Sequence, residues 1–103
     1  MQPLDRKYIL QLLFDHRKQL ASFGVEQIGL FGSFARDEAT EDSDVDLLVD
    51  LQQDKKKFRN FMSLNYYLEE LMGRKVELVT RQSLSPYIGP HILKSVEYVS
   101  IGN

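Results

Sequence analysis

Residues 32–50 read GSFARDEATEDSDVDLLVD, and this stretch decides how the chain folds. It begins with a Gly-Ser pair that interrupts an apolar run over Val25–Phe31, and it ends in a second apolar run over Asp44–Leu51. Apolar runs of this length, bounded by polar turn residues, are typical of buried strands. We therefore expect two strands at these positions. After the first strand we expect a short helix that Ser33 caps and that runs to about Arg36.

Helical and extended patterns continue on both sides of this stretch. Apolar residues recur at helical spacing before and after it, and a short apolar run follows the second helix. The expected elements are a helix over 5–22, a helix over 55–72 that Asp54 caps and Gly73 ends, a strand over 76–79, a short helix near 90–96, and a strand or tail over 97–101. This order predicts an α/β (α+β) fold with helices packed on a small mixed β-sheet, formed by one domain over residues 1–103.

The composition excludes several classes of protein. A net charge of −2 argues against the basic face that grips nucleic acid, so we expect no direct nucleic-acid binding. The absence of cysteine excludes disulfides and thiolate metal sites, and two histidines make a poor zinc site. The first residues lack the apolar stretch of a signal peptide, and no apolar run approaches the roughly 18 residues of a membrane span. We expect a cytoplasmic protein with no membrane contact.

The Gly32-Ser33 turn is the first candidate for chemistry. Glycine lets a main chain approach a ligand closely. The start of a helix offers unpaired N–H groups and a positive dipole end, which suit a phosphate. Because such turns are common in α/β proteins, a plain tight turn is the alternative interpretation.

Asp44 and Asp46 are the second candidate. Side chains alternate along a strand, which puts these two carboxylates on one face, about 7 Å apart along the chain. Neighbouring carboxylates repel each other and favour a cation between them, and oxygen ligands select a hard ion such as Mg²⁺. The alternative is that Asp44 belongs to the turn and Asp46 lies on a solvated edge. Aspartate is disfavoured in strands, so two of them at the start of an apolar strand indicate a function.

Glu77 is the third candidate because it interrupts the apolar run over residues 76–79. On its own it is typical of an exposed position. If its strand lies beside the strand that begins at Asp44, Glu77 completes a cage of three carboxylates with Asp44 and Asp46. Such a cage can hold two Mg²⁺ ions about 3.5–4 Å apart, an arrangement that serves nucleotidyl transfer.

Gly32-Ser33, ten further residues and Asp44-Val45-Asp46 together resemble the signature of the polymerase-β-like nucleotidyltransferase superfamily. The longer string of residues 32–50 is similar to the minimal nucleotidyltransferases, also called MNT-domain antitoxins. The similarity continues through LEELMGRKVELVT (68–80) and the C-terminal helix, so it covers nearly the whole chain. It implies the polymerase-β-like nucleotidyltransferase fold without the added domains of larger polymerases.

The resemblance implies a role for each matching position. Asp44, Asp46 and Glu77 would be the catalytic carboxylates and the ligands of Mg²⁺, with two ions expected. Gly32 and Ser33 would hold the triphosphate of ATP, the substrate.

Two positions depart from the family pattern. Glu77 stands where aspartate is usual, and its extra methylene could shift the ligand and weaken its action as a base. Asp37 stands where relatives often have glycine, and its carboxylate either repels phosphate or faces solvent.

Two further residues are candidates for nucleotide binding, each with a structural alternative. Arg36 lies one helical turn after Ser33 and either reaches a phosphate or pairs with a nearby acid, namely Asp37, Glu38 or Asp42. Ser43 either contacts the triphosphate or caps the turn before the second strand.

The remaining notable residues fit structural interpretations. Lys55, Lys56, Lys57 and Arg59 form a basic run that reads as a solvated surface, with contact to a partner or phosphate as the alternative. Tyr66 and Tyr67 are expected to divide between surface and core, and His16 to be packed on its helix.

Finally, the resemblance implies a function and a partner. Members of this subgroup silence a HEPN-domain ribonuclease toxin encoded beside them, in some cases by transferring AMP from ATP to its tyrosine. We therefore expect an antitoxin that is an adenylyltransferase and forms a hetero-oligomer with its toxin. The alternatives are an antitoxin that neutralises the toxin by binding alone and, ranked below both, a small-molecule nucleotidyltransferase.

Overall fold

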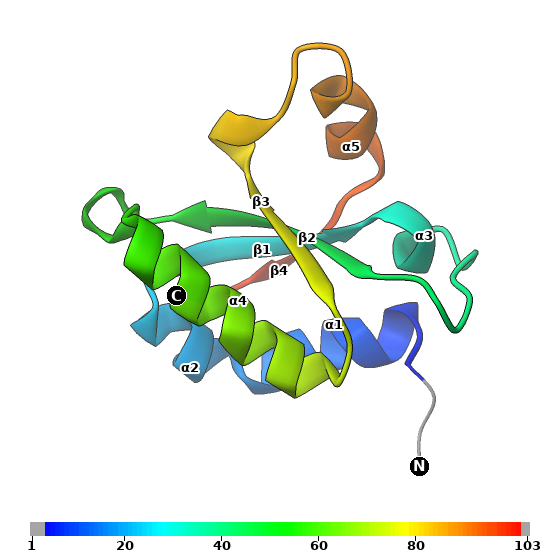
Figure 1. Ribbon diagram of the computed structural model, residues 1–103, viewed down its shortest axis with the longest axis horizontal. Coiled ribbons are helices and arrows are strands. Elements are labelled where there is room, and N and C mark those ends of the chain that lie inside the picture. The colour runs from blue at the N-terminus through cyan, green and yellow to red at the C-terminus, as the bar shows by residue number, and fades with distance from the viewer. Residues whose placement is uncertain (1–3, 102–103) are drawn as a thin grey trace.

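A four-stranded β-sheet lies at the centre of the computed structural model, which describes residues 4–101, the side chain of Gln82 excepted (Figure 1). The strands lie in the order β3-β2-β1-β4. β1 is antiparallel to both of its neighbours, and β2 is parallel to β3. The bounds are β1 Val25–Phe31, β2 Val45–Leu51, β3 Val76–Thr80 and β4 Glu97–Ser100. The expected mixed sheet is therefore confirmed.

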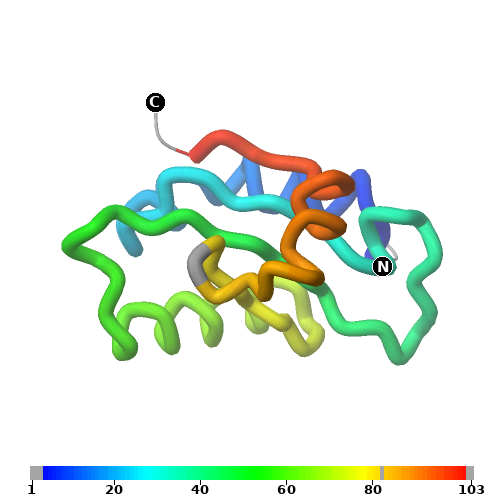
Figure 2. Tube along the Cα trace, turned by 90° about the horizontal axis from the view of Figure 1, so that it is seen from above, coloured from blue at the N-terminus to red at the C-terminus, as the bar shows by residue number. Residues whose placement is uncertain are grey.

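Three helices cover one face of this sheet, and α5 lies on the other side (Figures 1 and 2). The covering helices are α1 Arg6–Asp15, α2 Arg17–Ser22 and α4 Phe58–Met72. The short helix α3, Gly32–Ala35, follows β1 directly, and α5, Gly89–Ser95, leads into β4. Two 3₁₀ turns complete the list, at Gln53–Lys55 and Arg81–Ser83.

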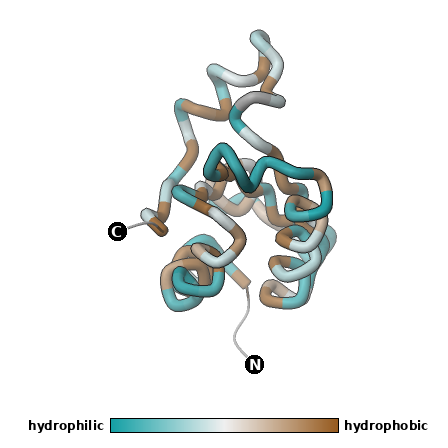
Figure 3. Tube along the Cα trace, turned by 90° about the vertical axis from the view of Figure 1, so that its left-hand side faces the viewer, coloured by the Kyte–Doolittle hydropathy of each residue, from teal (hydrophilic) through white to brown (hydrophobic). Residues whose placement is uncertain are grey.

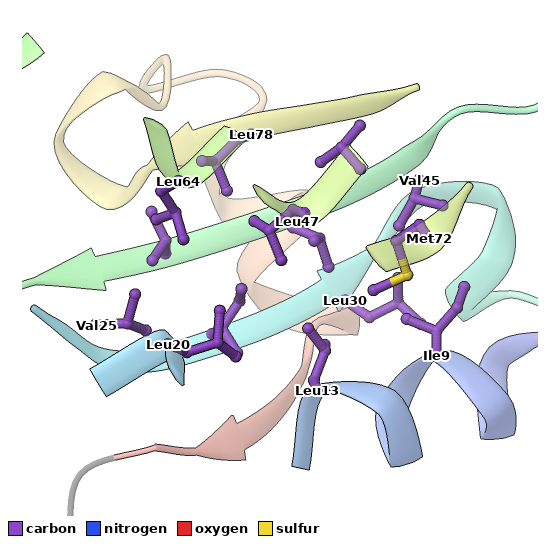
Figure 4. Close-up of a cluster of buried hydrophobic side chains, with 14 of the residues drawn as sticks. Ile9, Leu13, Leu20, Val25, Leu30, Val45, Leu47, Leu64, Met72 and Leu78 are labelled. Atoms are coloured by element: carbon purple, nitrogen blue, oxygen red, sulfur yellow. The ribbon is translucent and has the colours of Figure 1, made fainter. Parts of the chain in front are cut away.

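The hydrophobic core lies between the sheet and the three covering helices (Figure 4). Leu13 from α1, Leu20 from α2 and Leu64 from α4 are fully buried, and they belong to one cluster with Leu30 and Leu47 of the sheet. Because side chains alternate along a strand, the other face of β2 carries Asp46 and Asp50, with the buried Leu48 between them. The core thus fixes which residues of β2 point away from the helices.

The helix expected over 5–22 is divided by a turn at His16. Asp5 caps α1 by accepting a hydrogen bond from Tyr8 N at 2.8 Å, as an N-cap residue does. His16 packs its imidazole against the preceding turn, with Nδ1 2.9 Å from Leu12 O. The contact between the His16 imidazole and Leu12 O thus lies at the position where α1 ends and α2 begins.

The expected capping of the second long helix by Asp54 is wrong. Asp54 lies in a 3₁₀ turn, and α4 begins at Phe58 without a side-chain cap. Asn60 explains the delay, because its amide donates to Lys55 O at 2.9 Å and to Phe23 O at 2.8 Å and thereby holds this turn apart from the helix. The expected end at Gly73 is confirmed, with a left-handed φ of 66°.

The C-terminal part of the chain contains the expected short helix and a fourth strand. The short helix expected near 90–96 is α5, and residues 97–100 form a strand rather than a tail. β4 pairs with β1 from Gln27↔Ser100 to Leu30↔Glu97. Among the described residues, no helix has the length and apolar character needed to cross a membrane.

Candidate active site

Acidic side chains gather on the face of β2 and β3 that points away from the covering helices. Asp46 and Glu77 are direct register partners in the parallel pair, so their side chains leave the same face of the sheet. Asp44 lies directly before β2, two residues before Asp46, and alternation puts it on this face as well. Val45 and Leu47 are fully buried on the opposite face. The structure therefore brings the three sequence-predicted carboxylates onto one surface.

Asp46 is held in an unfavourable electrostatic environment. Partial burial raises its pKa to about 6, and the negative charges of Glu77 and Asp44 add to this effect. The positive charge of Arg36 acts in the opposite direction and lowers the pKa of Asp46. A half-buried carboxylate beside two like charges is the arrangement that a bound cation stabilises.

Gly32 packs its main chain against the Asp46 carboxylate. It follows Phe31, the register partner of Asp46, and it has a left-handed φ of 76°. A Cβ atom built on Gly32 would overlap Oδ2 of Asp46. The site therefore requires glycine twice over, for its backbone conformation and for the space beside the carboxylate.

The expectation that Ser33 caps the following helix is wrong. α3 begins at Gly32, its N-cap residue is Phe31, and no side chain caps it. Ser33 lies within the helix, half-buried, and its carbonyl oxygen accepts a hydrogen bond from Glu38 N at 2.9 Å. Because α3 has only four residues, the close approach of Gly32 matters more here than a helix dipole.

The other two candidates for nucleotide binding have partners within their own loop. Arg36 Nε donates to Glu38 Oε1 at 2.8 Å, so the ion-pair alternative holds for this side chain. Ser43 Oγ accepts a hydrogen bond from Thr40 N at 2.8 Å, which is the turn-closing alternative. The charge of Arg36 still lowers the pKa of Asp46 from this position.

The three carboxylates do not form a finished cage. Among the described residues, no group of three acidic or histidine side chains lies close enough to hold a metal ion as it stands. Glu77 is exposed at the edge of the sheet, whereas Asp44 and Asp46 are half-buried. Mg²⁺ in phosphate-transfer sites is commonly held by one or two carboxylates together with substrate phosphates. Two aspartates are enough for that mode of binding.

Arg74 is a residue of this site that sequence reasoning missed. Its Nη1 donates to three carbonyl oxygens, those of Thr40 at 3.1 Å, Glu41 at 3.0 Å and Ser43 at 2.8 Å. Its guanidinium also lies over the ring of Phe34, 5.3 Å from the centroid. Arg74 thereby ties the loop before Asp44 to α3. Nothing in a single sequence links position 74 to carbonyl groups more than 30 residues earlier.

Replacing Arg74 is expected to loosen this loop selectively. Arg74→Ala removes all three bonds, but Thr40 O still accepts from Ser43 N at 3.2 Å and only the bond to Ser43 O is half-buried, so the free energy of unfolding should fall by about 1 kcal/mol. Arg74→Lys keeps the charge but not the planar fork, so it should restore only part of the loss. Hydrogen exchange of the amides of residues 40–43 measures the effect. Unchanged exchange in both variants would show that the loop does not depend on Arg74.

Asp37 is exposed and pairs with Arg6 of α1. It adopts a left-handed φ of 57°, the conformation for which glycine is the usual residue. Its carboxylate pairs with Arg6 Nε at 3.4 Å, and Arg6 Nη1 also pairs with Glu97 Oε1 at 2.6 Å. The ion pair and the tolerance of aspartate for this conformation explain how position 37 accommodates a side chain.

Two substitutions of Asp37 separate these contributions. Asp37→Gly relieves the left-handed backbone and loses an exposed ion pair of small value, so stability should stay level or rise slightly. Asp37→Ala loses the pair and keeps the strain, so it should be about 1 kcal/mol less stable than the glycine variant. Urea unfolding of the two variants gives this difference directly. Equal stabilities would mean that the backbone conformation carries no strain.

Comparisons with known proteins identify the family of this chain. A family model described as a nucleotidyltransferase domain matches residues 11–99. The chain is 44% identical to the protein adenylyltransferase MntA of Thermococcus cleftensis, over 96% of this chain and 100% of that protein. It is 38% identical to a chain of Methanocaldococcus jannaschii assigned as a protein adenylyltransferase, over 88% of this chain and 94% of the relative.

Solved structures extend the likeness to three dimensions. One described as a minimal nucleotidyltransferase superposes with a TM-score of 0.78 and 31% identity, over 94% of this chain and 98% of that one. A chain from a toxin–antitoxin complex with AMP-PNP has a TM-score of 0.65 and 23% identity, over 92% of this chain and 72% of that one, and shares the fold. The chain belongs to the nucleotidyltransferase domain family and has the polymerase-β-like fold in its minimal form.

Proposed function

We propose that this chain is an antitoxin that transfers AMP from ATP to a hydroxyl group of its cognate toxin. The observation that carries the proposal is the Asp46 carboxylate, which is subject to the charges of Glu77 and Asp44 and lies against the Gly32 main chain. A relative that is 44% identical over nearly the whole chain is named a protein adenylyltransferase, which supports a protein as the acceptor.

Mg²⁺ fits the chemistry of this donor set. Asp46 is half-buried and its ionised form is disfavoured by Glu77 and Asp44, so a divalent cation would relieve a repulsion that the fold imposes. We propose that Asp44 and Asp46 hold the metal, with Glu77 turning inward as a third ligand. When bound, Mg²⁺ supplies positive charge that stabilises the transferring and leaving phosphoryl oxygens.

The residues of the site would then divide the reaction between them. Gly32 and Ser33 bring the main chain close to the triphosphate, and Arg36 adds positive charge at the same edge. The acceptor hydroxyl oxygen forms a bond to the α-phosphorus of ATP, the bond to the bridging oxygen breaks, and pyrophosphate leaves. Glu77, the most exposed of the three acids, would take the hydroxyl proton.

The partner class follows from the resemblance of residues 32–50 to the MNT-domain antitoxins. We propose that the acceptor is a tyrosine of a HEPN-domain ribonuclease toxin and that AMP on this tyrosine silences the toxin. An exposed carboxylate at position 77 favours a large acceptor, because an open site admits a side chain presented by another protein.

A second candidate is an antitoxin that acts by binding alone. The exposed position of Glu77 and the unfinished carboxylate cage favour it, since both are also expected of a site that has lost activity. A small-molecule nucleotidyltransferase ranks third, because the relatives that are 44% and 38% identical are both named as protein adenylyltransferases.

One experiment separates the three functions. The neighbouring toxin is purified after co-expression with the wild-type chain or with the Asp44→Asn, Asp46→Asn double variant, and its mass is measured while cell growth is recorded. Adenylylation predicts an added AMP and rescued growth with the wild type only. Rescue by both chains without added mass supports binding alone. Label passing from ATP only to small molecules would support the third candidate and overturn the proposal.

A further inference from the structure

A groove lies along the outer edge of β3, at the opposite end of β2 from Asp46. It has a volume of about 560 Å³. Its walls are the N-terminal turn of α4 and the last residues of β3, and we call it the β3-edge groove. The residues that matter here are Lys56, Lys57, Phe58, Phe61, Leu78 and Thr80. None of its lining residues is acidic.

β3 presents unpaired main-chain groups to this groove. It is an edge strand, and the bond from Val45 N to Lys75 O at 3.0 Å fixes which of its residues bond to β2. In a parallel pair with this register, Val76, Leu78 and Thr80 direct their N–H and C=O groups outward. Glu69 accepts from Val76 N at 3.1 Å, but within the described part of the chain nothing bonds to the main chain of Leu78.

An exposed aromatic ring stands beside these groups. Phe58 is 78% exposed at the start of α4. Exposing an apolar ring of this size to water is unfavourable, and such exposure often marks a surface for binding a partner. Phe61, one helical turn later, is half-buried and packs against the core. The groove thus combines a hydrogen-bonding edge with an apolar wall, as surfaces that accept an added strand do.

Positive charge dominates the same end of the molecule. Lys55, Lys56, Lys57 and Arg59 are all exposed, and none forms an ion pair with another described residue. Figure 3 views the molecule from this end, and the strongly hydrophilic loop between β2 and α4 faces the viewer. The whole chain has a net charge of −2, so this basic cluster is a local feature.

We propose that the β3-edge groove binds an extended acidic segment of a partner protein as an additional strand beside β3. The main chain of the segment would pair with the outward groups of Leu78, and its acidic side chains would face Lys56 and Lys57. A second copy of this chain is disfavoured, because edge-to-edge pairing of two β3 strands brings two basic clusters together. Single-stranded nucleic acid would match the charge and Phe58 but would leave the main chain of β3 unpaired.

This interaction does not depend on AMP transfer. Asp46 lies near the start of β2, whereas Leu51 at its end contributes to the groove. A strand bound beside β3 therefore lies next to Glu77 in the edge strand but does not cover Asp46 on β2. The catalytic variant Asp46→Asn should bind the segment as the wild type does, so failure of either proposal can be recognised separately.

The test uses a fluorescein-labelled peptide of four Glu-Val repeats and the full chain. We expect saturable binding by fluorescence anisotropy and at least tenfold slower hydrogen exchange of the Leu78 amide in the complex. Lys56→Glu with Lys57→Glu should weaken binding at least tenfold, and Phe58→Ser should weaken it several-fold. Lys7→Glu with Lys18→Glu is the matched control, since it changes the net charge equally at two other exposed sites.

Two further probes identify the occupant. A peptide of Glu-Pro repeats keeps the charge but lacks the N–H groups that pair with a strand edge, so it should not bind. An oligo-dT strand tests the nucleic-acid alternative. The proposal is overturned if the Glu-Val peptide does not bind, if the control variant weakens binding as much as the groove variant, if the Glu-Pro peptide binds equally well, or if oligo-dT alone protects Leu78.

Discussion

Asp46→Asn is expected to reduce AMP transfer by about a thousandfold or more and, in the absence of metal, to make the protein more stable. The loss of activity follows from removing a charge that holds the cation and the triphosphate. The gain in stability follows from the environment of Asp46, where burial and then the charges of Glu77 and Asp44 raise its pKa. A neutral amide of the same shape relieves this repulsion.

The sign of the pH dependence follows from the raised pKa. The folded state binds the Asp46 proton more tightly than the unfolded state, since its pKa is about 6 instead of 3.8. The contribution of Asp46 to the free energy of unfolding of the metal-free wild type should therefore be greatest below about pH 4. It should fall as the pH rises to 6. Because the side chain is only half-buried, we expect a total change of about 1 kcal/mol.

Thermal unfolding in EDTA and in Mg²⁺ measures these effects. Between pH 4 and 7, the Asp46→Asn variant should lack this component of the fall that the wild type shows. Mg²⁺ should raise the unfolding temperature of the wild type at pH 7.5 and leave that of the variant nearly unchanged. A variant that is less stable than the wild type in EDTA, or that gains equally from Mg²⁺, would contradict this account of the carboxylate.

The second large effect is expected from Gly32→Ala. The added methyl group meets Oδ2 of Asp46, and the left-handed backbone at φ 76° adds about 1–2 kcal/mol of strain for any residue with a Cβ. The carboxylate must move or the turn must open. Either displacement separates the proposed phosphate turn from the proposed metal ligand, so AMP transfer should fall at least about a hundredfold.

Gly73→Ala is a matched control for Gly32→Ala. Gly73 has a similar φ of 66°, but a Cβ there meets nothing within 4 Å. It should therefore show the backbone strain alone, about 1–2 kcal/mol, with activity close to that of the wild type at a temperature where both are folded. Equal activity losses in the two glycine variants would show that backbone strain, and not contact with Asp46, explains the Gly32 effect.

The sequence was sufficient for β1, β2 and β3 and for the grouping of the acids, whereas it left β4 open as a strand or a tail. β1 has the expected bounds, because an apolar run between Gly24 and Gly32 leaves little freedom in where a strand begins and ends. The shared face of Asp46 and Glu77 also follows from the sequence once β3 is assumed to lie beside β2, since alternation then fixes the direction of both side chains.

The features that sequence reasoning missed depend on contacts between distant segments. The late start of α4 is set by Asn60, whose amide reaches Phe23 O, 37 residues away. Capping rules consider only neighbours in the chain, so they pointed to Asp54. Arg74 escaped notice for the same reason, and the resting position of Glu77 depends on a rotamer that the sequence pattern does not determine.

The three hydrogen bonds of Arg74 have a consequence for the entropy of substrate binding. They order the loop before Asp44 when the protein folds, so this segment has little conformational freedom left to lose when a nucleotide arrives. Preorganisation of this kind favours a small entropic penalty on association. Calorimetry should accordingly find that Arg74→Ala weakens nucleotide binding mainly through a less favourable entropy.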